Sequence, residues 1–518
     1  MYPGRLEIVE DFDVVEPAAA VLVESLRAFG YTPETAIADL IDNSLSAGAK
    51  NAWLNFHWSG KDSYIVICDD GRGMSESDLV NAMRPGSQHP LTSRDPKDLG
   101  RFGLGLKTAS FSQCRCLTVA SKTNNSPLAV RRWDLDYLAN VYRMAGDSGW
   151  RLLRSSAPGS EGHLGRLSEI ARGTIVLWER MDRIVGDADL RDSLAQDRFF
   201  DTVTAVHEHL AMVFHRYLEG PRPRLSIFIN GRDPQHRVMP WDPFLRTQRS
   251  TWCTPMERIE VGPSEITVQG FVLPHKDKLG PDLHAEAAGP KGWNAQQGFY
   301  VYRNERLLVP GSWLGLGRPR SWTKEEHYKL ARILVDIPNS MDGDWHLDVK
   351  KSTARPPARI RQRLKGLAEV VRKQARDVFA HRGTYNVRRQ SVDLEHLWRP
   401  IARDGRTAYR ISRDHPLVRS LKMSPSEFTE DLEILLKLLE DTVPVQQIWL
   451  DVAERPDTHS RPFESFERLD VIAVMGRVYH ALRVVEKLKR AEAIDRLSKM
   501  WPFRDYQDLI DSLPDEQE

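Results

Sequence analysis

Three short polar stretches near the start of the chain constrain its fold more than any other feature. They are "ETAIADLIDNSLSAG" (residues 34–48), "DDGRGM" (69–74) and "GRFGLGLKTAS" (100–110), and they follow one another at nearly even intervals. Each has an ordinary structural interpretation when it is taken alone. Their order and spacing therefore have to decide between structure and function.

The first stretch predicts a helix with one polar side. Its apolar residues recur at helical spacing, at Ala36, Ile37, Leu40, Ile41 and Leu45. Asp39 and Asn43 are four residues apart, so their side chains lie one turn apart on one face. That face is either a solvated surface or a functional pair. In a functional pair the carboxylate would serve acid/base chemistry and the amide oxygen would bind a hard cation such as Mg²⁺.

The second stretch, "DDGRGM", directly follows the strand-like run "SYIVIC". Asp-Gly after an apolar run is a common hairpin signal. A carboxylate at a strand end can also accept a hydrogen bond from an exocyclic amine such as that of adenine. Gly71 and Gly73 would then allow the backbone to approach a flat base closely. Alone, the stretch leaves both interpretations open.

In the third stretch, Gly100, Gly103 and Gly105 lead into an expected helix start. Backbone N–H groups at such a start suit phosphate oxygens, and Lys107 adds a positive charge within the same turn. The glycine spacing fits neither the dinucleotide-binding fingerprint nor the P-loop. The polar segment before it, "MRPGSQHPLTSRDPKD", is typical of a lid loop.

Together the stretches resemble the GHKL ATPase superfamily, the group of DNA gyrase B, heat-shock chaperones, histidine kinases and MutL. "ADLIDNS" resembles its N box, "DDGRGM" and "GRFGLGLKTAS" its two glycine boxes, and "GTIVLW" the late strand whose threonine supports the adenine-binding aspartate. The resemblance covers about residues 17–180. It implies bound ATP and Mg²⁺, with Asn43 on the metal and Asp69, rather than Asp70, on adenine. The remaining nucleotide contacts that it implies are Gly71, Gly73, Met74, Gly100, Arg101, Phe102, Gly103, Leu104, Gly105, Lys107 and Thr174.

The resemblance continues into the following residues. "SIFINGRDPQ", "GFYVYRNERLLV" and "WHLDVKKSTARPP" resemble the transducer domain of the gyrase, MutL and MORC branch. That domain supplies a lysine to the γ-phosphate, which implies a catalytic role for Lys351 or Lys350. The sequence around the N box, "LRAFGYTPETAIADLIDNSLSAGAK", most resembles MORC-like ATPases and their bacterial relatives. Four scattered cysteines cannot build the cysteine-rich zinc module of that family.

Asp39 departs from the family pattern. The superfamily usually has a glutamate as general base four residues before the Mg²⁺-binding asparagine. Aspartate is one methylene shorter, so its reach toward an attacking water falls by about 1.5 Å, the length of one C–C bond. We therefore expect slow hydrolysis, or a helix that lies closer to the nucleotide.

Composition describes an ordinary globular protein. The 518 residues are 41% hydrophobic and 28% charged with a formal net charge of +1, so only a local patch could attract nucleic acid. We expect an α+β fold in three parts, namely an ATPase domain with an N-terminal arm (1–218), a transducer domain (219–357) and a charged helical C-terminal region (358–518). Residues 323–335 are expected to be helical. We also expect reduced packing cysteines and a cytoplasmic protein, because no signal pattern or membrane-length apolar run is present.

The resemblance implies an ATP-gated dimeric clamp, and we expect a homodimer that acts on duplex DNA. Residues 350–382 are rich in Lys and Arg and could bind DNA phosphates, although a solvated charged helix is an equal alternative. Bacterial relatives suggest a setting in restriction or phage defence. The alternative function is a chaperone-like clamp that acts on protein clients or a partner subunit. A histidine kinase is disfavoured because too few residues precede the N box for a phospho-accepting hairpin.

Overall fold

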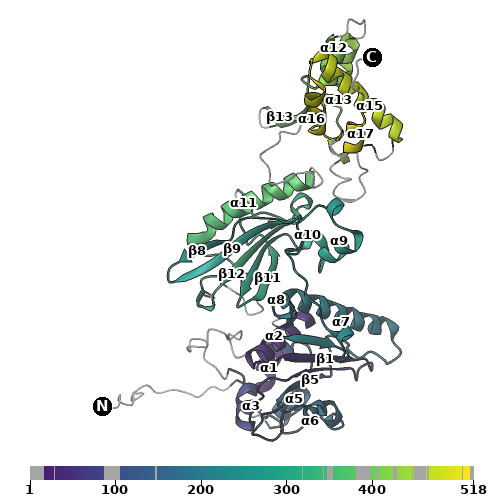
Figure 1. Cartoon of the computed structure of the whole chain (residues 1–518). Helices are drawn as coiled ribbons and strands as arrows, with labels where there is room; N and C mark the ends of the chain where they lie inside the picture. Colours follow the sequence, from purple (N-terminus) through teal and green to yellow (C-terminus); the bar gives the residue numbers. More distant parts are fainter. Residues whose placement is uncertain are drawn as a thin grey trace. The chain divides into compact units, whose positions relative to one another are not determined.

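The computed structural model describes residues 17–513 except 29, 87–104, 146–148, 318, 342, 347–353, 381–396, 404–405, 424–428, 446, 449–462, 464–465 and 504–505. The chain divides into two compact units, Met1–Tyr385 and Asn386–Glu518. The first unit contains two α+β blocks, each built around its own sheet (Figure 1). The expected α+β fold is confirmed.

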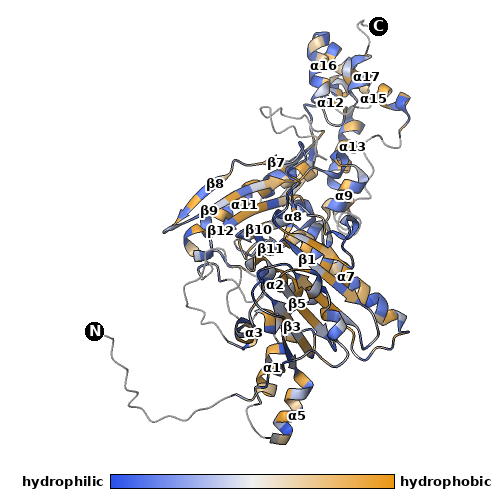
Figure 2. Cartoon of the chain, turned by 60° about the horizontal axis from the view of Figure 1, so that its bottom comes forward, coloured by the Kyte–Doolittle hydropathy of each residue, from blue (hydrophilic) through white to orange (hydrophobic). Residues whose placement is uncertain are grey.

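The first block is built on a six-stranded sheet with the strand order β4-β3-β5-β2-β1-β6. Its strands are β1 (Asn51–His57), β2 (Tyr64–Asp69), β3 (Cys116–Lys122), β4 (Ala129–Asp134), β5 (Gly173–Glu179) and β6 (Ser226–Ile229). Neighbours are antiparallel except β1 and β6, which are parallel. Apolar colouring is dense along β3 and β5 (Figure 2), and buried clusters lie against both faces of the sheet. Both faces of the sheet are therefore packed.

Most of the helices cover one face of this sheet. They are α1 (Ala19–Arg27), α2 (Pro33–Ser46), α3 (Glu76–Met83), α4 (Gly105–Phe111), α5 (Leu135–Ala145), α7 (Ser193–Val213) and α8 (His215–Leu218). The large core lies between these helices and the strand residues Ile67, Val119 and Val176. Among the described residues, the opposite face carries the short η1 (Glu161–Leu164) and α6 (Arg166–Glu169), over a small core that includes Cys68 and Ile175.

Helix α2 has the predicted apolar face, and residues on its polar side are buried as well. Thr32 and Thr35 form a reciprocal cap at its start, where Pro33 occupies the first helical position. The predicted apolar residues are buried except Leu45, which is partly exposed, and Asp39 and Asp42 on the polar side are buried as well. The polar side of α2 is therefore mostly an interior surface.

The second block has a sheet with the order β11-β10-β12-β9-β7, and β8 also pairs with β9. The strands are β7 (Trp252–Cys253), β8 (Glu257–Val261), β9 (Ser264–Val272), β10 (Gly298–Arg303), β11 (Arg306–Ser312) and β12 (Ala331–Ile337). Short helical segments connect them, at η2 (Pro234–His236), η3 (Lys276–Lys278), α9 (Pro281–Ala287), α10 (Gly292–Ala295), η4 (Glu326–Tyr328) and η5 (Asn339–Met341).

The helix expected over residues 323–335 is wrong, because the chain forms η4 and then strand β12 there. Strand β12 lies between β10 and β9 and is buried along most of its length. The centre of β12, Ile333, Leu334 and Val335, is an unbroken apolar run, and periodicity cannot distinguish such a run from part of a buried helix. The error therefore has a physical origin.

Helix α11 (Ala358–Ala380) packs on the second sheet (Figure 1). Ile360, Leu364, Ala368 and Val371 belong to the same buried cluster as β9, β10 and β12. A Cβ at Gly270 of β9 would lie 2.3 Å from Val371, so only glycine permits this approach. The predicted C-terminal region begins at residue 358, but packing groups α11 with the second block.

The C-terminal unit is not wholly helical, which corrects that expectation. It begins with a hairpin of β13 (Trp398–Arg403) and β14 (Arg406–Ile411). Its helices are α12 (Pro416–Met423), α13 (Thr429–Asp441), α15 (Arg468–His480), α16 (Arg490–Ser498) and α17 (Gln507–Asp511), with a π-helical turn at Ala481–Val485. Met475, Leu482 and Leu497 are central to its own core. The helical part of the prediction is confirmed.

None of the helices within the described ranges combines the length and apolar character needed to cross a bilayer. All four cysteines are free thiols, and only Cys253 is exposed. The packing interpretation of the cysteines therefore fits Cys68, Cys114 and Cys116.

Removing a side chain from the α11 contact tests its place in the second core. Leu364 is fully buried, so Leu364→Ala should lower the free energy of unfolding by about 2–5 kcal/mol. Val370 is 53% exposed on the same helix, so Val370→Ala is the matched control and should have little effect. Denaturant unfolding measures both. Equal, small effects of the two changes would contradict the packing of α11.

Candidate functional site

The described parts of the three predicted stretches meet on the helix-covered face of the first sheet. Asp69 ends β2 and lies opposite Thr174 in the β2–β5 register. Thr174 in turn lies opposite Ser121 of β3. These residues alternate with Cys68, Ala120 and Ile175, which pack on the other face. Asp69, Ser121 and Thr174 therefore form a polar row on the face where α2 and α4 lie.

The Asp69 carboxylate is buried and held from two sides. Its Oδ1 accepts a hydrogen bond from the Gly71 N–H at 2.9 Å, and its Oδ2 accepts one from the Ser44 hydroxyl of α2 at 2.9 Å. Burial raises the pKa of Asp69 to about 6, although hydrogen bonds from Gly71, Ser44 and the Thr174 backbone act in the opposite direction. The carboxylate is fixed in orientation, and with a pKa of about 6 it is mostly ionised at pH 7.

Asp70, unlike Asp69, holds the backbone at the start of β1. Its Oδ1 accepts hydrogen bonds from the backbone N–H groups of Lys50 at 2.7 Å and Asn51 at 2.9 Å. Its Oδ2 accepts one from the Asn51 side chain at 2.8 Å. Asp70 thus fastens the chain at the start of β1, which agrees with choosing Asp69 as the candidate ligand-binding residue.

The glycines of the corner allow close packing between chain segments. A Cβ on Gly71 would lie 2.7 Å from the Ala47 side chain, just after α2. Gly73 has a φ of +68°, and a Cβ there would lie 1.9 Å from the Lys122 carbonyl oxygen. Both glycines therefore bring the corner against α2 and β3, a role that the sequence analysis did not assign to them.

Met74 and Thr174 are joined through Ser121. The Ser121 hydroxyl accepts a hydrogen bond from the Met74 N–H at 2.9 Å and lies 2.8 Å from the Thr174 hydroxyl. It also donates to the Gly173 carbonyl at 3.0 Å. Ser121 therefore connects the corner after β2 to the late strand β5.

The side chain of Asp39, a residue of α2, faces the start of α4. The Tyr31 hydroxyl donates a hydrogen bond to its Oδ2 at 2.9 Å. The same oxygen lies 3.8 Å from where a Cβ on Gly105 would be. The predicted base is thus next to the described end of the second glycine stretch.

Lys107 contacts backbone carbonyls at the end of α3. It is 2% exposed, and its Nζ donates to the carbonyls of Ala82 at 2.8 Å and Arg84 at 3.0 Å, at the end of α3. Burial lowers the pKa of Lys107 to about 8. The ammonium therefore holds the end of α3, and its expected phosphate contact stays a prediction. Gly100, Arg101, Phe102, Gly103, Leu104, Lys350 and Lys351 lie outside the described residues.

Asn43 is the exposed polar side chain of the N-box stretch. It follows the buried Asp42, and its amide forms no hydrogen bond within the described ranges. Mg²⁺ in nucleotide sites commonly takes one or two protein oxygens and completes its shell with phosphates and water. Those ranges contain no cluster of three or more His, Cys, Asp or Glu side chains that could hold an ion. A single amide oxygen on an open face fits Mg²⁺ carried by a nucleotide.

A buried ion pair joins α2 to the second block. Arg306 at the start of β11 donates from Nε to the Asp42 Oδ1 at 2.9 Å, and the two side chains are 5% and 2% exposed. The guanidinium also lies over the Phe214 ring, 4.3 Å from its centre. The N-box stretch is therefore tied to β11 one residue before Asn43.

Sequence reasoning missed four residues of this arrangement, which are Tyr31, Ser44, Ser121 and Arg306. Ser44 lay inside the quoted "ADLIDNS" stretch, and Arg306 lay inside "YVYRNERLLV". Their stretches were visible in the sequence. The partners of Ser44, Ser121 and Arg306 are distant along the chain. Tyr31 lies only eight residues before its partner Asp39, and the fold turns the two side chains toward each other.

Comparisons with known proteins agree with this geometry. Residues 31–146 match the family model of the histidine kinase-, DNA gyrase B- and HSP90-like ATPases. The chain is 28% identical to the ATPase morc-1 of Caenorhabditis elegans over 116 residues, 22% of this chain and 13% of the relative. It is 31% identical to the DNA mismatch repair protein MutL of Halobacterium salinarum over 124 residues, 24% and 18% of the two chains. For the MutL of Pelotomaculum thermopropionicum the identity is 29% over 132 residues, 25% and 20%.

The fold, the site and these matches define a GHKL-superfamily ATPase domain. Within that superfamily the chain is similar, over the aligned residues, to a MORC ATPase and to MutL proteins. The aligned parts span about an eighth to a fifth of the length of these curated relatives.

The variant Asp69→Asn should change ATP binding and protein stability in opposite directions. Asp69→Asn should abolish ATP binding, because an NH2 group replaces one carboxylate oxygen and this group cannot accept a hydrogen bond from the adenine amine. The raised pKa means that the neutral form stabilises the fold. This contribution to the free energy of unfolding is complete below pH 3.8, the pKa of Asp69 in the unfolded chain. It is lost as the pH rises through about 6, the pKa of Asp69 in the folded chain. The variant should therefore gain roughly 2–3 kcal/mol over the wild type between pH 4 and pH 7.

Calorimetric ATP titration and denaturant unfolding at the two pH values measure these effects. Asp70→Asn is the matched control, which should keep ATP binding and lose about 1–3 kcal/mol of stability. Tight ATP binding by Asp69→Asn, or a stability difference that does not change with pH, would contradict the assignment.

A double-mutant cycle tests the ion pair. Arg306→Gln leaves the Asp42 charge buried without its partner and should lower the free energy of unfolding by about 3–5 kcal/mol. The double variant Asp42→Asn/Arg306→Gln should recover much of that loss. Denaturant unfolding of the three variants gives the coupling energy. Additive single effects would show that the pair is not coupled.

Proposed function

We propose that the chain binds ATP with Mg²⁺ on this face and hydrolyses it to ADP and phosphate. The observation that supports this most strongly is the fixed Asp69 carboxylate at the end of β2, held by Gly71 and Ser44. In this proposal Asp69 accepts the adenine amine, and Asn43 supplies an oxygen to Mg²⁺. One of Lys350 and Lys351 would reach the γ-phosphate.

Asp39 is the proposed general base. The Tyr31 hydroxyl orients its carboxylate. A base must lie within about 2.6–3.2 Å of the group whose proton it takes, or act through one water. The shorter aspartate side chain therefore favours slow turnover or a relay through a second water.

Single-turnover hydrolysis tests this role. Asp39→Asn should slow hydrolysis by about 10²–10⁴-fold, the usual contribution of a positioned base, while ATP still binds. Tyr31→Phe is the matched control, because it removes the orienting hydrogen bond but leaves the carboxylate, and its effect should be smaller. Unchanged hydrolysis in Asp39→Asn with ATP bound would show that another group is the base.

The client that we propose is duplex DNA, held by a nucleotide-gated homodimeric clamp. Support comes from the MORC and MutL matches and from the cations of α11. Many of these cations are already engaged, since Arg359, Arg363 and Lys365 pair with Asp344, Glu257 and Glu369. Arg372 is packed against Trp313, Trp322 and Tyr328.

Fewer cations of this segment are therefore left for phosphates. Arg355, Arg361 and Lys373 are exposed and form no ion pair within the described part of the chain. We accordingly propose a modest, backbone-directed contact with DNA. The setting in bacterial restriction or phage defence rests on resemblance alone.

The ATPase rate with duplex DNA over a salt series tests the client. DNA should stimulate turnover, and the logarithm of apparent DNA affinity should fall with that of salt with a slope of about −0.9 per phosphate contact. Arg361→Glu/Lys373→Glu should weaken this stimulation. It should also make the salt slope shallower, by the amount expected for the loss of about two phosphate contacts. Arg222→Glu changes an exposed arginine of the first unit and should have no effect. No stimulation by DNA at any salt concentration would contradict this client.

A protein client or partner is the second candidate, and one observation favours it. Ile434, Leu435, Leu438 and Leu439 are 57%, 51%, 59% and 46% exposed on one side of α13. Adjacent exposed aliphatic side chains are a common mark of protein contact surfaces. ATP-dependent dimerisation without stimulation by DNA would favour this candidate.

A further inference from the structure

A pocket lies on the face of the first sheet opposite the nucleotide site. After α5 the chain pairs with the edge of β4 through Leu153 and then crosses the sheet as η1 and α6. Between this crossing and β4 is an open cavity of about 730 Å³. Small-molecule sites commonly measure about 300–1,000 Å³.

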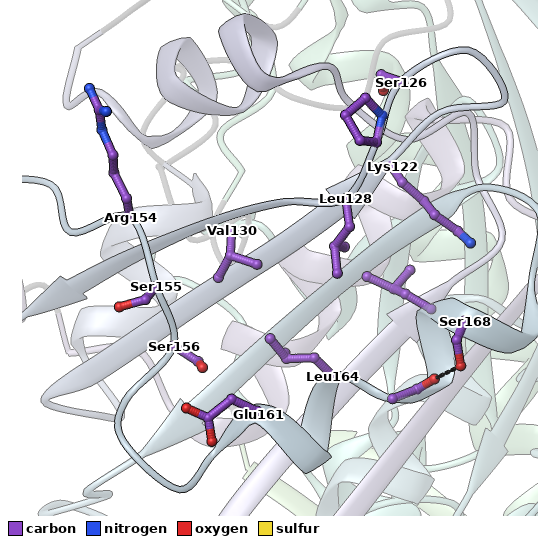
Figure 3. Close-up of a pocket in the computed structure, with 13 residues that line it drawn as sticks. Lys122, Ser126, Leu128, Val130, Arg154, Ser155, Ser156, Glu161, Leu164 and Ser168 are labelled. Carbon is purple, nitrogen blue, oxygen red and sulfur yellow. Dashed lines mark hydrogen bonds between the residues drawn. The ribbon is translucent and has the colours of Figure 1, made fainter.

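The floor of the pocket is apolar. Leu128, Val130 and Leu164 gather at its centre, with Val130 on β4 and Leu164 on η1 (Figure 3). Leu128 is 49% exposed, although it lies beside buried aliphatic neighbours. A ligand with an apolar body would remove this surface from water, and burial of apolar area stabilises such a complex.

The rim of the pocket is polar and contains more positive than negative side chains. Arg154 lies toward one end and Lys122 toward the other, with Glu161 on the side of Arg154 (Figure 3). None of these three forms an ion pair within the described residues. The hydroxyls of Ser155 and Ser156 add hydrogen-bonding groups near Arg154. Two cations against one carboxylate favour an anionic ligand.

The pocket shares strands with the nucleotide face but does not open onto it. Ser121 lies in the polar row with Asp69, whereas the next residue, Lys122, lines the pocket. Thr174 and Ile175 alternate in the same way on β5. One layer of the sheet therefore separates the two faces, and both could be occupied at once.

We propose that this pocket binds a small organic anion with an apolar body. The anionic group would lie at the Arg154 or Lys122 end, and the apolar body would rest on Leu128, Val130 and Leu164. This site is separate from the ATP site and does not depend on the function proposed above.

The fluorescent anion 8-anilinonaphthalene-1-sulfonate is a suitable probe, because it combines an apolar ring system with a sulfonate. Titration into the full chain should give saturable one-to-one binding. Arg154→Glu/Lys122→Glu should weaken binding at least tenfold by reversing the rim charge. Leu128→Trp should weaken probe binding to a similar extent, because the larger side chain fills part of the pocket. Arg222→Glu is the surface-charge control and should bind like the wild type.

Two further measurements separate the pocket from other apolar surfaces. Probe binding should persist in Asp69→Asn and in the presence of a saturating non-hydrolysable ATP analogue. Leu128 and Arg154 are both exposed, so circular dichroism should show folded variants. Displacement by the analogue, unsaturable binding, or full binding by either pocket variant would overturn the proposal.

Discussion

The buried ion pair of Asp42 and Arg306 joins the two blocks of the first unit at the nucleotide face. Either charge alone in that position would cost several kcal/mol, so the pair holds α2 against β11 only while both partners are present. Asn43 follows Asp42 directly, and Asp39 is less than one turn earlier. A displacement of β11 would therefore reach the residues that we place on metal and water. This contact gives the second block a physical route to the site besides the lysine that we propose, Lys350 or Lys351.

Burial of carboxylates explains how the rest of the face is arranged. Asp39, Asp42 and Asp69 are each buried, and each has its own partner, which are Tyr31, Arg306 and Ser44 with Gly71. Buried acidic groups require such partners because an isolated charge is strongly disfavoured away from water. Asn43, in contrast, remains exposed. The same sheet presents a polar row on this face and an apolar pocket on the other.

The sequence was sufficient for local features and insufficient for distant pairings. Helical spacing predicted the apolar side of α2, and motif position favoured Asp69 over Asp70. Ser44, Tyr31 and Arg306 were missed because their roles depend on partners that only the fold brings near. The strand β12 was mistaken for a helix because its centre, residues 333–335, is a short apolar run whose periodicity does not distinguish a strand from a helix. Likewise, α11 was expected to carry a free basic patch, but its partners on the second sheet engage several of its cations.

The central claim is that ATP binds with adenine at Asp69 and Mg²⁺ at Asn43. The most direct measurement is a crystal structure of the full chain with Mg²⁺ and a non-hydrolysable ATP analogue. We predict that the adenine amine lies within hydrogen-bonding distance of the Asp69 carboxylate and that the Asn43 amide oxygen binds the metal. Adenine bound elsewhere, or a metal held without Asn43, would contradict the account.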